Sequence, residues 1–163
     1  MSRLSLFCLG AVLAAATAVA SAETPRLVRK VLPGTSIVVL VAEGDFEPRS
    51  VGSYSVRAYA GTNPQFPYDN FIAGAVQPRY GSVDDILFAD VDRDGSPEIV
   101  VVIRSAGTGG YLSADAFRLQ GSSLYLVESV SGLAKDADPI AALQAKFAGG
   151  AEAPTAPDVG SRR

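Results

Sequence analysis

The sequence predicts an all-β domain, a mainly antiparallel β-sandwich of about seven strands followed by one short C-terminal helix. Short segments that are either apolar or alternating recur along the chain, and turns rich in glycine, proline and aspartate separate them. Between these segments there is no helical crossover of the length that joins parallel strands. Only one segment, near the C-terminus, carries the end signals of a helix.

The first 22 residues are typical of a secretory signal peptide. Arg3 supplies a positive start, residues 4–19 are apolar, and residues 20–22 (Ala-Ser-Ala) match a cleavage site of the A-x-A type. We expect cleavage after Ala22 and export of the remaining chain. Cys8 lies inside the apolar run, whereas a lipoprotein would carry its cysteine at the cleavage point, so we expect no membrane anchor.

Seven segments are predicted as strands. Residues 36–44 are apolar and β-branched, which is typical of a buried strand, whereas residues 52–61 alternate between two kinds of side chain. The remaining predicted strands are residues 71–76, 83–91, 98–105, 111–120 and 123–130. Phe46 and Phe71 are expected in the core, because large aromatic side chains gain most from burial.

The single predicted helix begins where Asp138 can cap it and Pro139 can occupy its first turn, and it ends at a Gly-Gly pair. These signals define the domain limits. Residues 23–35 are predicted as a loosely ordered lead-in, residues 36–149 as the β-sandwich domain, and residues 150–163 as a disordered tail.

Composition excludes several classes of function. The sequence has no histidine, and its one cysteine lies in the signal peptide, so Ser-His-Asp, thiol and zinc-thiolate chemistry are excluded. Loss of Arg3 leaves 13 basic residues (14 − 1) against 17 acidic ones, and such a chain is poorly suited to bind nucleic acid. Asp84 and Asp85 are neighbours in a predicted strand and point to opposite faces, so they cannot act together as a glycosidase pair. We expect a protein that is not an enzyme.

One loop carries carboxylates at alternate positions. Counted from Asp90, its oxygen-bearing side chains occupy positions 1, 3, 5, 7 and 9, with a glycine at position 6. Such a pattern can wrap a calcium ion, although a full EF-hand would have a glutamate at position 12, where Val101 stands. The alternative is a metal-free polar turn. We expect no required cofactor and regard the following residues as a candidate structural calcium site: Asp90, Asp92, Asp94, Ser96 and Glu98.

A second loop, residues 105–111 (Ser-Ala-Gly-Thr-Gly-Gly-Tyr), separates two predicted strands and is hereafter the glycine loop. It does not fit a phosphate cradle, because the segment after it alternates like a strand instead of starting a helix. Glycines make a thin probe, and an aromatic residue beside them resembles an interface anchor. A structurally idle hairpin loop is the alternative. The candidate partner-binding residues are Ser105, Gly107, Thr108, Gly109, Gly110 and Tyr111.

The chain resembles a known family, the periplasmic inhibitors of invertebrate-type (I-type) lysozyme. The resemblance rests on FEPRSVGSYSVRAY (46–59), FPYDNFIAGAVQPR (66–79), FADVDRDGSPEIVVVIRSAGTGGYLSADAF (88–117) and the hairpin that follows. It implies a β-sandwich in the periplasm of a Gram-negative bacterium, with a protruding loop that enters the lysozyme cleft. Related inhibitor families carry a Ser-Gly-x-Tyr signature in this loop, and here Thr108 stands in place of the serine.

The resemblance also implies a mechanism. The hydroxyls of Thr108 and Tyr111 would hydrogen-bond to the two catalytic carboxylates of the lysozyme, and the tyrosine ring would fill a sugar subsite. Ser105 is an alternative source of the essential hydroxyl. The resemblance permits a homodimer. A function of another class is a calcium-braced binding or adhesion module that uses residues 90–98, with sugar platforms drawn from Tyr54, Tyr59, Phe66, Tyr68 and Tyr80.

Overall fold

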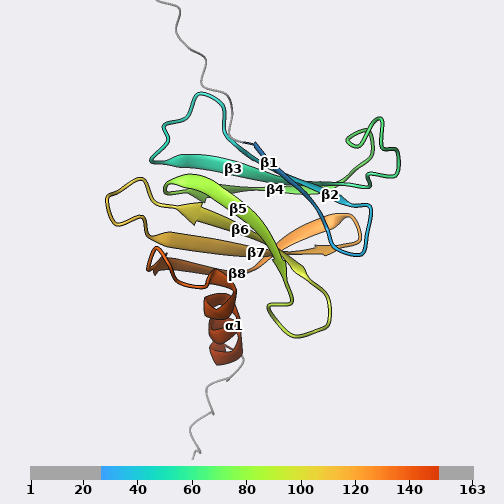
Figure 1. Ribbon diagram of the computed structural model, residues 1–163. Coiled ribbons are helices and arrows are strands. Elements are labelled where there is room, and N and C mark those ends of the chain that lie inside the picture. Colours follow the sequence, from blue (N-terminus) through green and yellow to red (C-terminus); the bar gives the residue numbers. More distant parts are fainter. Residues whose placement is uncertain (1–26, 151–163) are drawn as a thin grey trace, which may run out of the picture.

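The computed structural model describes residues 27–150. Its eight strands form two four-stranded antiparallel sheets, followed by one helix (Figure 1). The first sheet has the order β1 (Leu27–Val31), β2 (Val38–Glu43), β3 (Gly52–Tyr59) and β4 (Phe71–Arg79). The second has the order β5 (Ser82–Ala89), β6 (Glu98–Arg104), β7 (Leu112–Gln120) and β8 (Ser123–Leu133), and the helix α1 spans Pro139–Gly150. The predicted all-β sandwich with a C-terminal helix is confirmed, with eight strands in place of about seven.

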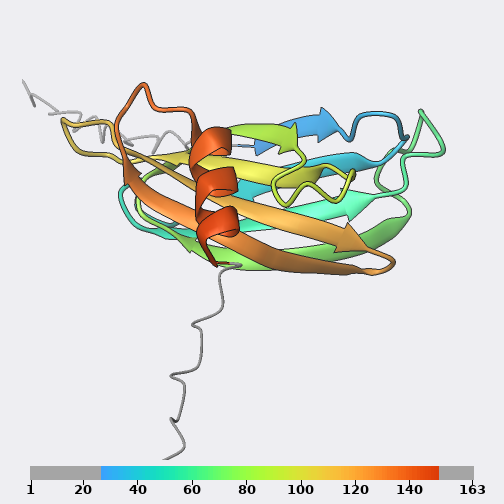
Figure 2. The same ribbon diagram turned by 90° about the horizontal axis from the view of Figure 1, so that it is seen from below.

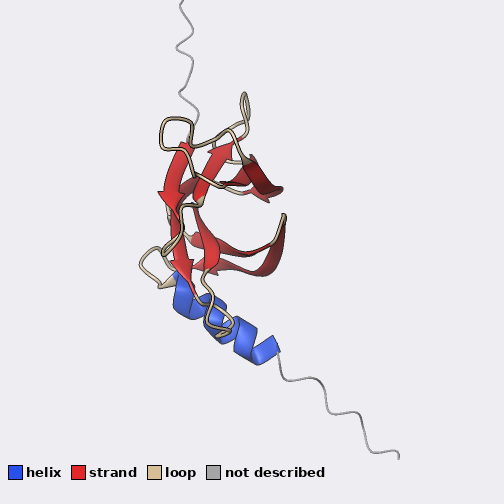
Figure 3. Ribbon diagram, turned by 90° about the vertical axis from the view of Figure 1, so that its right-hand side faces the viewer, coloured by secondary structure: helices blue, strands red, loops and turns tan. Residues whose placement is uncertain are grey.

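The main core lies between the two sheets, which Figure 3 shows face to face. Alternation along β3 directs Tyr54 and Val56 into this core, where the Tyr54 ring meets Phe117 edge-to-face at 6.4 Å between centroids. The other buried members come from both sheets and from the turn after β1: Leu32, Val39, Val41, Val83, Ile86, Ile99, Val101 and Ile103.

A second core lies on the outer side of the β5–β8 sheet, beneath α1 (Figure 2). Leu143 of the helix is buried there in one cluster with Val100 and Val102 of β6 and with Leu112, Ala114 and Ala116 of β7. Strand β6 is therefore covered on both faces, which explains why its sequence is continuously apolar and does not alternate. The predicted cap is confirmed: Asp138 Oδ1 accepts hydrogen bonds from the amides of Ile140 and Ala141, at 2.9 and 3.3 Å.

The lead-in differs from its prediction as a loosely ordered segment. Within it, β1 pairs with β2 in antiparallel register from Leu27 to Val31. Val28 packs on the main core, and Lys30 forms a 2.8 Å ion pair with Asp85 of the opposite sheet. Two of its five residues are charged, so the alternation of more and less exposed side chains along this strand cannot be recognised in the sequence.

Two further expectations concern the ends of the chain. The predicted signal peptide, its cleavage site and residues 151–163 of the tail lie outside the described residues, while Gly150 belongs to α1. Between residues 27 and 150, no helix is long and apolar enough to cross a membrane.

The expectation that Phe46 and Phe71 lie in the core is wrong, because both side chains are exposed.

Candidate functional site

The glycine loop joins β6 to β7 and projects from one end of the sandwich, at the left of Figure 1. Its base is closed by the Ser105 amide, which donates to the Tyr111 carbonyl at 2.9 Å. Inside the loop, the Gly110 amide donates to the Gly107 carbonyl at 3.1 Å. The two hydrogen bonds give the loop a defined shape, and residues 106–109 are exposed at its tip.

Arg104, the last residue of β6, fixes the loop to the body of the domain. Its Nη2 donates to Asp84 Oδ2 at 2.7 Å, and its Nη1 donates to the Gly110 carbonyl at 3.3 Å and to the Lys135 carbonyl at 3.4 Å. The hydrogen bond with Asp84 raises the pKa of the Arg104 guanidinium. Asp84 and Asp85 have different partners on different sheets, as expected for neighbours that point to opposite faces. Arg104 was not identified from the sequence.

Tyr111 presents its ring at the exit of the loop, with 57 % of the residue exposed. The ring lies directly over Gly109: a Cβ atom at position 109 would come within 2.4 Å of Tyr111 Cε2. Gly110 adopts a φ of +56°, which strongly favours glycine. A glycine is therefore needed at position 109 to leave room for the tyrosine ring, and at position 110 to allow the positive φ of the backbone. A Cβ at Gly107 would meet nothing within 4 Å.

The three predicted hydroxyl groups differ in accessibility. Ser105 belongs to the closed base of the loop, and its Oγ is buried and has no hydrogen-bond partner. Thr108 and Tyr111 are exposed. Only Thr108 and Tyr111 can therefore present hydroxyls to a partner without rearrangement of the loop.

The aspartate loop (residues 90–98) joins β5 to β6 and appears at the lower right of Figure 1. Asp90 accepts hydrogen bonds from the amides of Asp94 and Gly95, at 3.1 and 3.0 Å, and Asp94 accepts one from Ser96 at 2.8 Å. β6 separates this loop from the glycine loop by about 20 Å, since a strand rises about 3.3 Å per residue. The two candidate sites are therefore independent.

A guanidinium lies among the carboxylates of the aspartate loop. Asp90, Asp92 and Glu98 each place a carboxylate oxygen within 4.8 Å of the others, a set that can hold a cation. Arg118 Nη2 donates to Glu98 Oε1 at 2.9 Å and also to Asp92, and the bond to Glu98 raises the pKa of Arg118. Arg118 was missed in the sequence because only the pairing of β6 with β7 brings it opposite Glu98.

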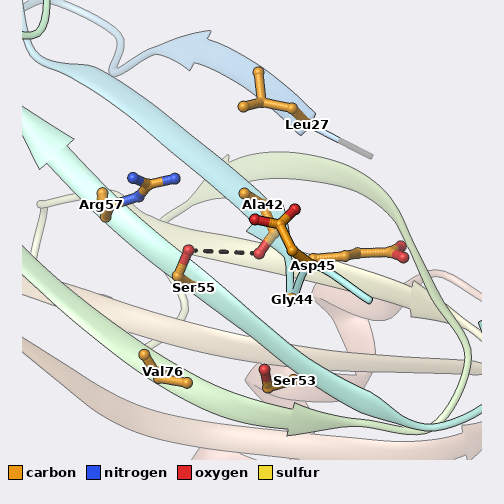
Figure 4. Close-up of a pocket in the computed structure, with 9 residues that line it drawn as sticks. Leu27, Ala42, Gly44, Asp45, Ser53, Ser55, Arg57 and Val76 are labelled. Carbon is orange, nitrogen blue, oxygen red and sulfur yellow. Dashed lines mark hydrogen bonds between the residues drawn. The ribbon is translucent and has the colours of Figure 1, made fainter. Parts of the chain in front are cut away.

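The outer face of the β1–β4 sheet carries an open groove of about 480 Å³ (Figure 4). Its floor is made of small side chains, including Ser55, whose Oγ donates to the Ala42 carbonyl at 3.4 Å. Its larger side chains are Leu27, Arg57 and Val76, together with the carboxylates Glu43 and Asp45. The groove lies on the sheet that does not carry the glycine loop, so it is separate from the candidate partner-binding site.

A second pocket, of about 280 Å³, lies between the sheets near β4 and β8. Its carboxylate, Asp115, accepts hydrogen bonds from the Tyr54 hydroxyl at 2.5 Å and the Ser129 hydroxyl at 2.6 Å. Burial, together with the nearby Asp115, raises the pKa of Tyr54. Among the aromatic residues considered as sugar platforms, Tyr54 is buried, while Tyr59 and Tyr68 pack edge-to-face at 5.4 Å.

Comparison with known proteins identifies the family. Residues 26–147 match the family model described as periplasmic lysozyme inhibitor of I-type lysozyme. The chain belongs to this family. It is an inhibitor of I-type lysozyme and not an enzyme.

Two solved structures are similar to this inhibitor. One is the crystal structure of PliI-Ah, periplasmic lysozyme inhibitor of I-type lysozyme from Aeromonas hydrophila, with 49 % identity and a TM-score of 0.65. It covers 72 % of this chain and 98 % of its own. The other is Aeromonas hydrophila PliI in complex with Meretrix lusoria lysozyme, with 49 % identity, a TM-score of 0.66, and coverage of 73 % and 95 %. A search among curated proteins gave no match.

Proposed function

We propose that this inhibitor acts by inserting the glycine loop into the active-site cleft of an I-type lysozyme, so that substrate is excluded. The observation that carries the proposal is the exposed Tyr111, held at the end of a narrow, braced loop that projects from the domain. A loop of fixed shape loses little conformational entropy when it binds. A similar inhibitor, from Aeromonas hydrophila, is known in complex with a lysozyme.

The chemistry of the loop suits a glycosidase cleft. A lysozyme active site holds two carboxyl groups on either side of the scissile bond. The Thr108 and Tyr111 hydroxyls can donate hydrogen bonds to these groups, and hydrogen bonds to charged groups contribute about 1.5–3 kcal/mol each. Because the Ser105 hydroxyl is buried, Thr108 is the better candidate for the second donor. The tyrosine ring replaces a sugar, and Gly107 and Gly109 let the backbone follow the floor of the cleft.

No cofactor is part of the proposed mechanism. Arg118 supplies positive charge among the carboxylates of the aspartate loop, and amide hydrogen bonds satisfy Asp90 and Asp94. We assign this loop a structural role in which a calcium ion is not needed. The supporting result is inhibition that is equal in calcium and in excess EDTA. Loss of inhibition on chelation would show instead that a structural calcium ion holds the aspartate loop.

Export and self-association complete the proposal. The signal peptide is cleaved after Ala22, which mass spectrometry of the periplasmic protein tests by the presence of Glu23 at the N-terminus.

A homodimer would bury the exposed apolar side chains of Leu27, Val31 and Val76 on the outer face of the β1–β4 sheet. The molar mass measured by light scattering tests this: twice the monomer mass supports the dimer, and the monomer mass excludes it.

The experiment that tests the function is a lysis assay on bacterial cell walls. Purified residues 23–163 are titrated against an I-type lysozyme, with chicken-type and goose-type lysozymes in parallel. Stoichiometric inhibition of the I-type enzyme that is lost in Tyr111→Ala supports insertion of the glycine loop. Inhibition that survives this substitution removes the loop from the mechanism.

A further inference from the structure

Phe46 has an unusual position for a phenylalanine. It lies in the β2–β3 loop (residues 44–51), its relative exposure is 107 %, and its φ of +63° is a value that bulky residues rarely adopt. A fully exposed ring adds no packing energy to the domain, and the positive φ costs stability. Backbone conformations of this kind occur often at functional sites.

The loop around Phe46 is held firmly in place. The Glu47 carboxylate accepts hydrogen bonds from the Ser53 amide at 2.5 Å and from the Ser53 hydroxyl at 2.8 Å. Arg79, which is only 1 % exposed, donates to the carbonyls of Pro48 at 3.1 Å and Arg49 at 3.0 Å. Because its neighbours are fixed in this way, the loop presents the phenylalanine ring to solvent in a defined position.

The same buried arginine connects this loop to the glycine loop. Arg79 Nη1 also donates to the Gly81 carbonyl at 2.5 Å, in the turn between β4 and β5. Gly81 packs so closely on the end of β6 that a Cβ there would lie 2.0 Å from the Arg104 carbonyl oxygen. Arg104 is the residue that braces the glycine loop. The two loops therefore rise from one rigid base at the same end of the sandwich, at the left of Figure 1.

We propose that Phe46 is a second anchor for the lysozyme that receives the glycine loop, and that its ring packs into an apolar recess on the rim of the cleft. This inference rests on the proposed function and extends the binding surface beyond the cleft. Two exposed side chains near the shared base, Val51 next to β3 and Tyr80 next to Gly81, add apolar area at this end of the domain. Aromatic side chains are frequent anchors in protein–protein interfaces.

The test removes the ring without introducing backbone strain. Asparagine tolerates a positive φ, so Phe46→Asn keeps the loop conformation, and Phe46→Gly provides a second variant of the same design. Both are expected to weaken inhibition about 10- to 100-fold, as expected for loss of a buried phenylalanine ring, mainly through faster dissociation. Their melting temperatures are expected to stay equal to that of the wild type or to rise by a few degrees.

Two matched controls lie at the opposite end of the domain. Arg93→Asn relieves the other non-glycine residue of positive φ among the described residues, at +64°, and Phe66→Ala removes another exposed phenylalanine, which is 61 % exposed. Both controls are expected to inhibit like the wild type. An equal loss of inhibition in Phe66→Ala would overturn the inference, since the effect would then not depend on the β2–β3 loop.

Tyr111→Ala in the same assay separates this inference from the proposed function. If Tyr111→Ala loses inhibition while both Phe46 variants keep it, the second anchor is refuted and the glycine loop remains. If Tyr111→Ala and the Phe46 variants all keep inhibition, the proposed function fails, and the inference fails with it. If both sites matter, the two losses are expected to multiply in the double variant, because the anchors act on separate recesses.

Discussion

Replacement of Tyr111 by alanine is the most direct perturbation of the proposed mechanism. The residue is 57 % exposed in the free inhibitor, and the structure shows no hydrogen bond from its hydroxyl to any other described residue. Its loss is therefore expected to leave the fold intact. In the complex, the same ring would be enclosed by the walls of the cleft, so the substitution acts on binding.

The magnitude follows from the exposed area and the hydroxyl. A tyrosine offers about 200 Å² for burial, of which 57 % corresponds to about 110 Å² in this inhibitor, or about 3 kcal/mol at 25 cal/mol per Å². A hydrogen bond to a carboxylate adds about 1.5–3 kcal/mol. Fixing the side chain and desolvating its hydroxyl offset part of this sum. The net loss is about 2–4 kcal/mol, which corresponds to about 30- to 1000-fold weaker inhibition.

The assay measures the inhibition constant from cell-wall lysis, together with the dissociation rate of the complex. Tyr111→Phe separates ring from hydroxyl and is expected to lose about 10- to 150-fold, the share of the hydrogen bond alone. Tyr125→Ala is the matched control, because this tyrosine of β8 is 53 % exposed. It lies opposite Arg118 in the register of β7 and β8, at the end of the sandwich away from the glycine loop. It is expected to inhibit like the wild type.

Two results would refute the reasoning. A Tyr111→Ala inhibitor within threefold of the wild type would show that the ring is not enclosed in the complex. An equal loss in Tyr125→Ala would show that the assay responds to surface aromatic residues in general. A melting temperature close to that of the wild type in each variant is the condition under which both comparisons hold.

Four further predictions concern individual contacts. Gly109→Ala should displace the tyrosine ring and weaken inhibition about tenfold or more in the lysis assay, with Gly107→Ala, whose Cβ meets nothing in the free protein, losing less. Arg118→Met should lower the free energy of unfolding in urea by about 2–4 kcal/mol without affecting inhibition, because a buried glutamate loses its cationic partner. Hydrogen bonds from Ser53 lower the pKa of the Glu47 carboxyl below its ordinary value of 4.5. The stability that the charged carboxylate adds is therefore present above pH 4.5 and is lost as the pH falls through the lowered pKa. In Glu47→Gln the melting temperature should vary less with pH over this range. The pKa of Tyr54 is raised, so the stability that its neutral hydroxyl adds is fully present below the unfolded-state pKa of about 10 and falls as the pH rises above it. Tyr54→Phe should therefore lessen the loss of stability at alkaline pH, as measured by the melting temperature.

Sequence reasoning was most successful where one segment carried its own signal. The start of the helix was predicted from Asp138 and Pro139, a signal that acts within a single turn, whereas the predicted stop fell one residue short, since Gly150 belongs to α1. The strand before the glycine loop was predicted from an apolar run, although the run did not reveal that α1 covers one of its faces. β1 was missed because its five residues gain their order from pairing with β2, and such pairing is not a property of the segment alone.

The site shows the same division. Composition and motif indicated a thin loop with hydroxyls and a tyrosine, but the distinction between Ser105 and Thr108 depends on which side chain the closed base of the loop buries. Phe46 was expected in the core because it is large and apolar. Its neighbour Glu47 instead accepts two hydrogen bonds from Ser53, and in the loop held in this way the phenylalanine ring faces solvent.

By itself, the sequence determined the all-β class, the N-terminal cap of the helix, the absence of histidine and cysteine chemistry in the domain, and the glycine loop with its tyrosine, because each depends on composition or on residues close together in the chain. Tertiary structure decided which charged groups meet. Arg118 reaches Glu98 across a strand pair, and Arg79 joins three segments at one end of the sandwich. These contacts are set by strand register and sheet packing, in which a shift of one residue would exchange the buried and exposed faces.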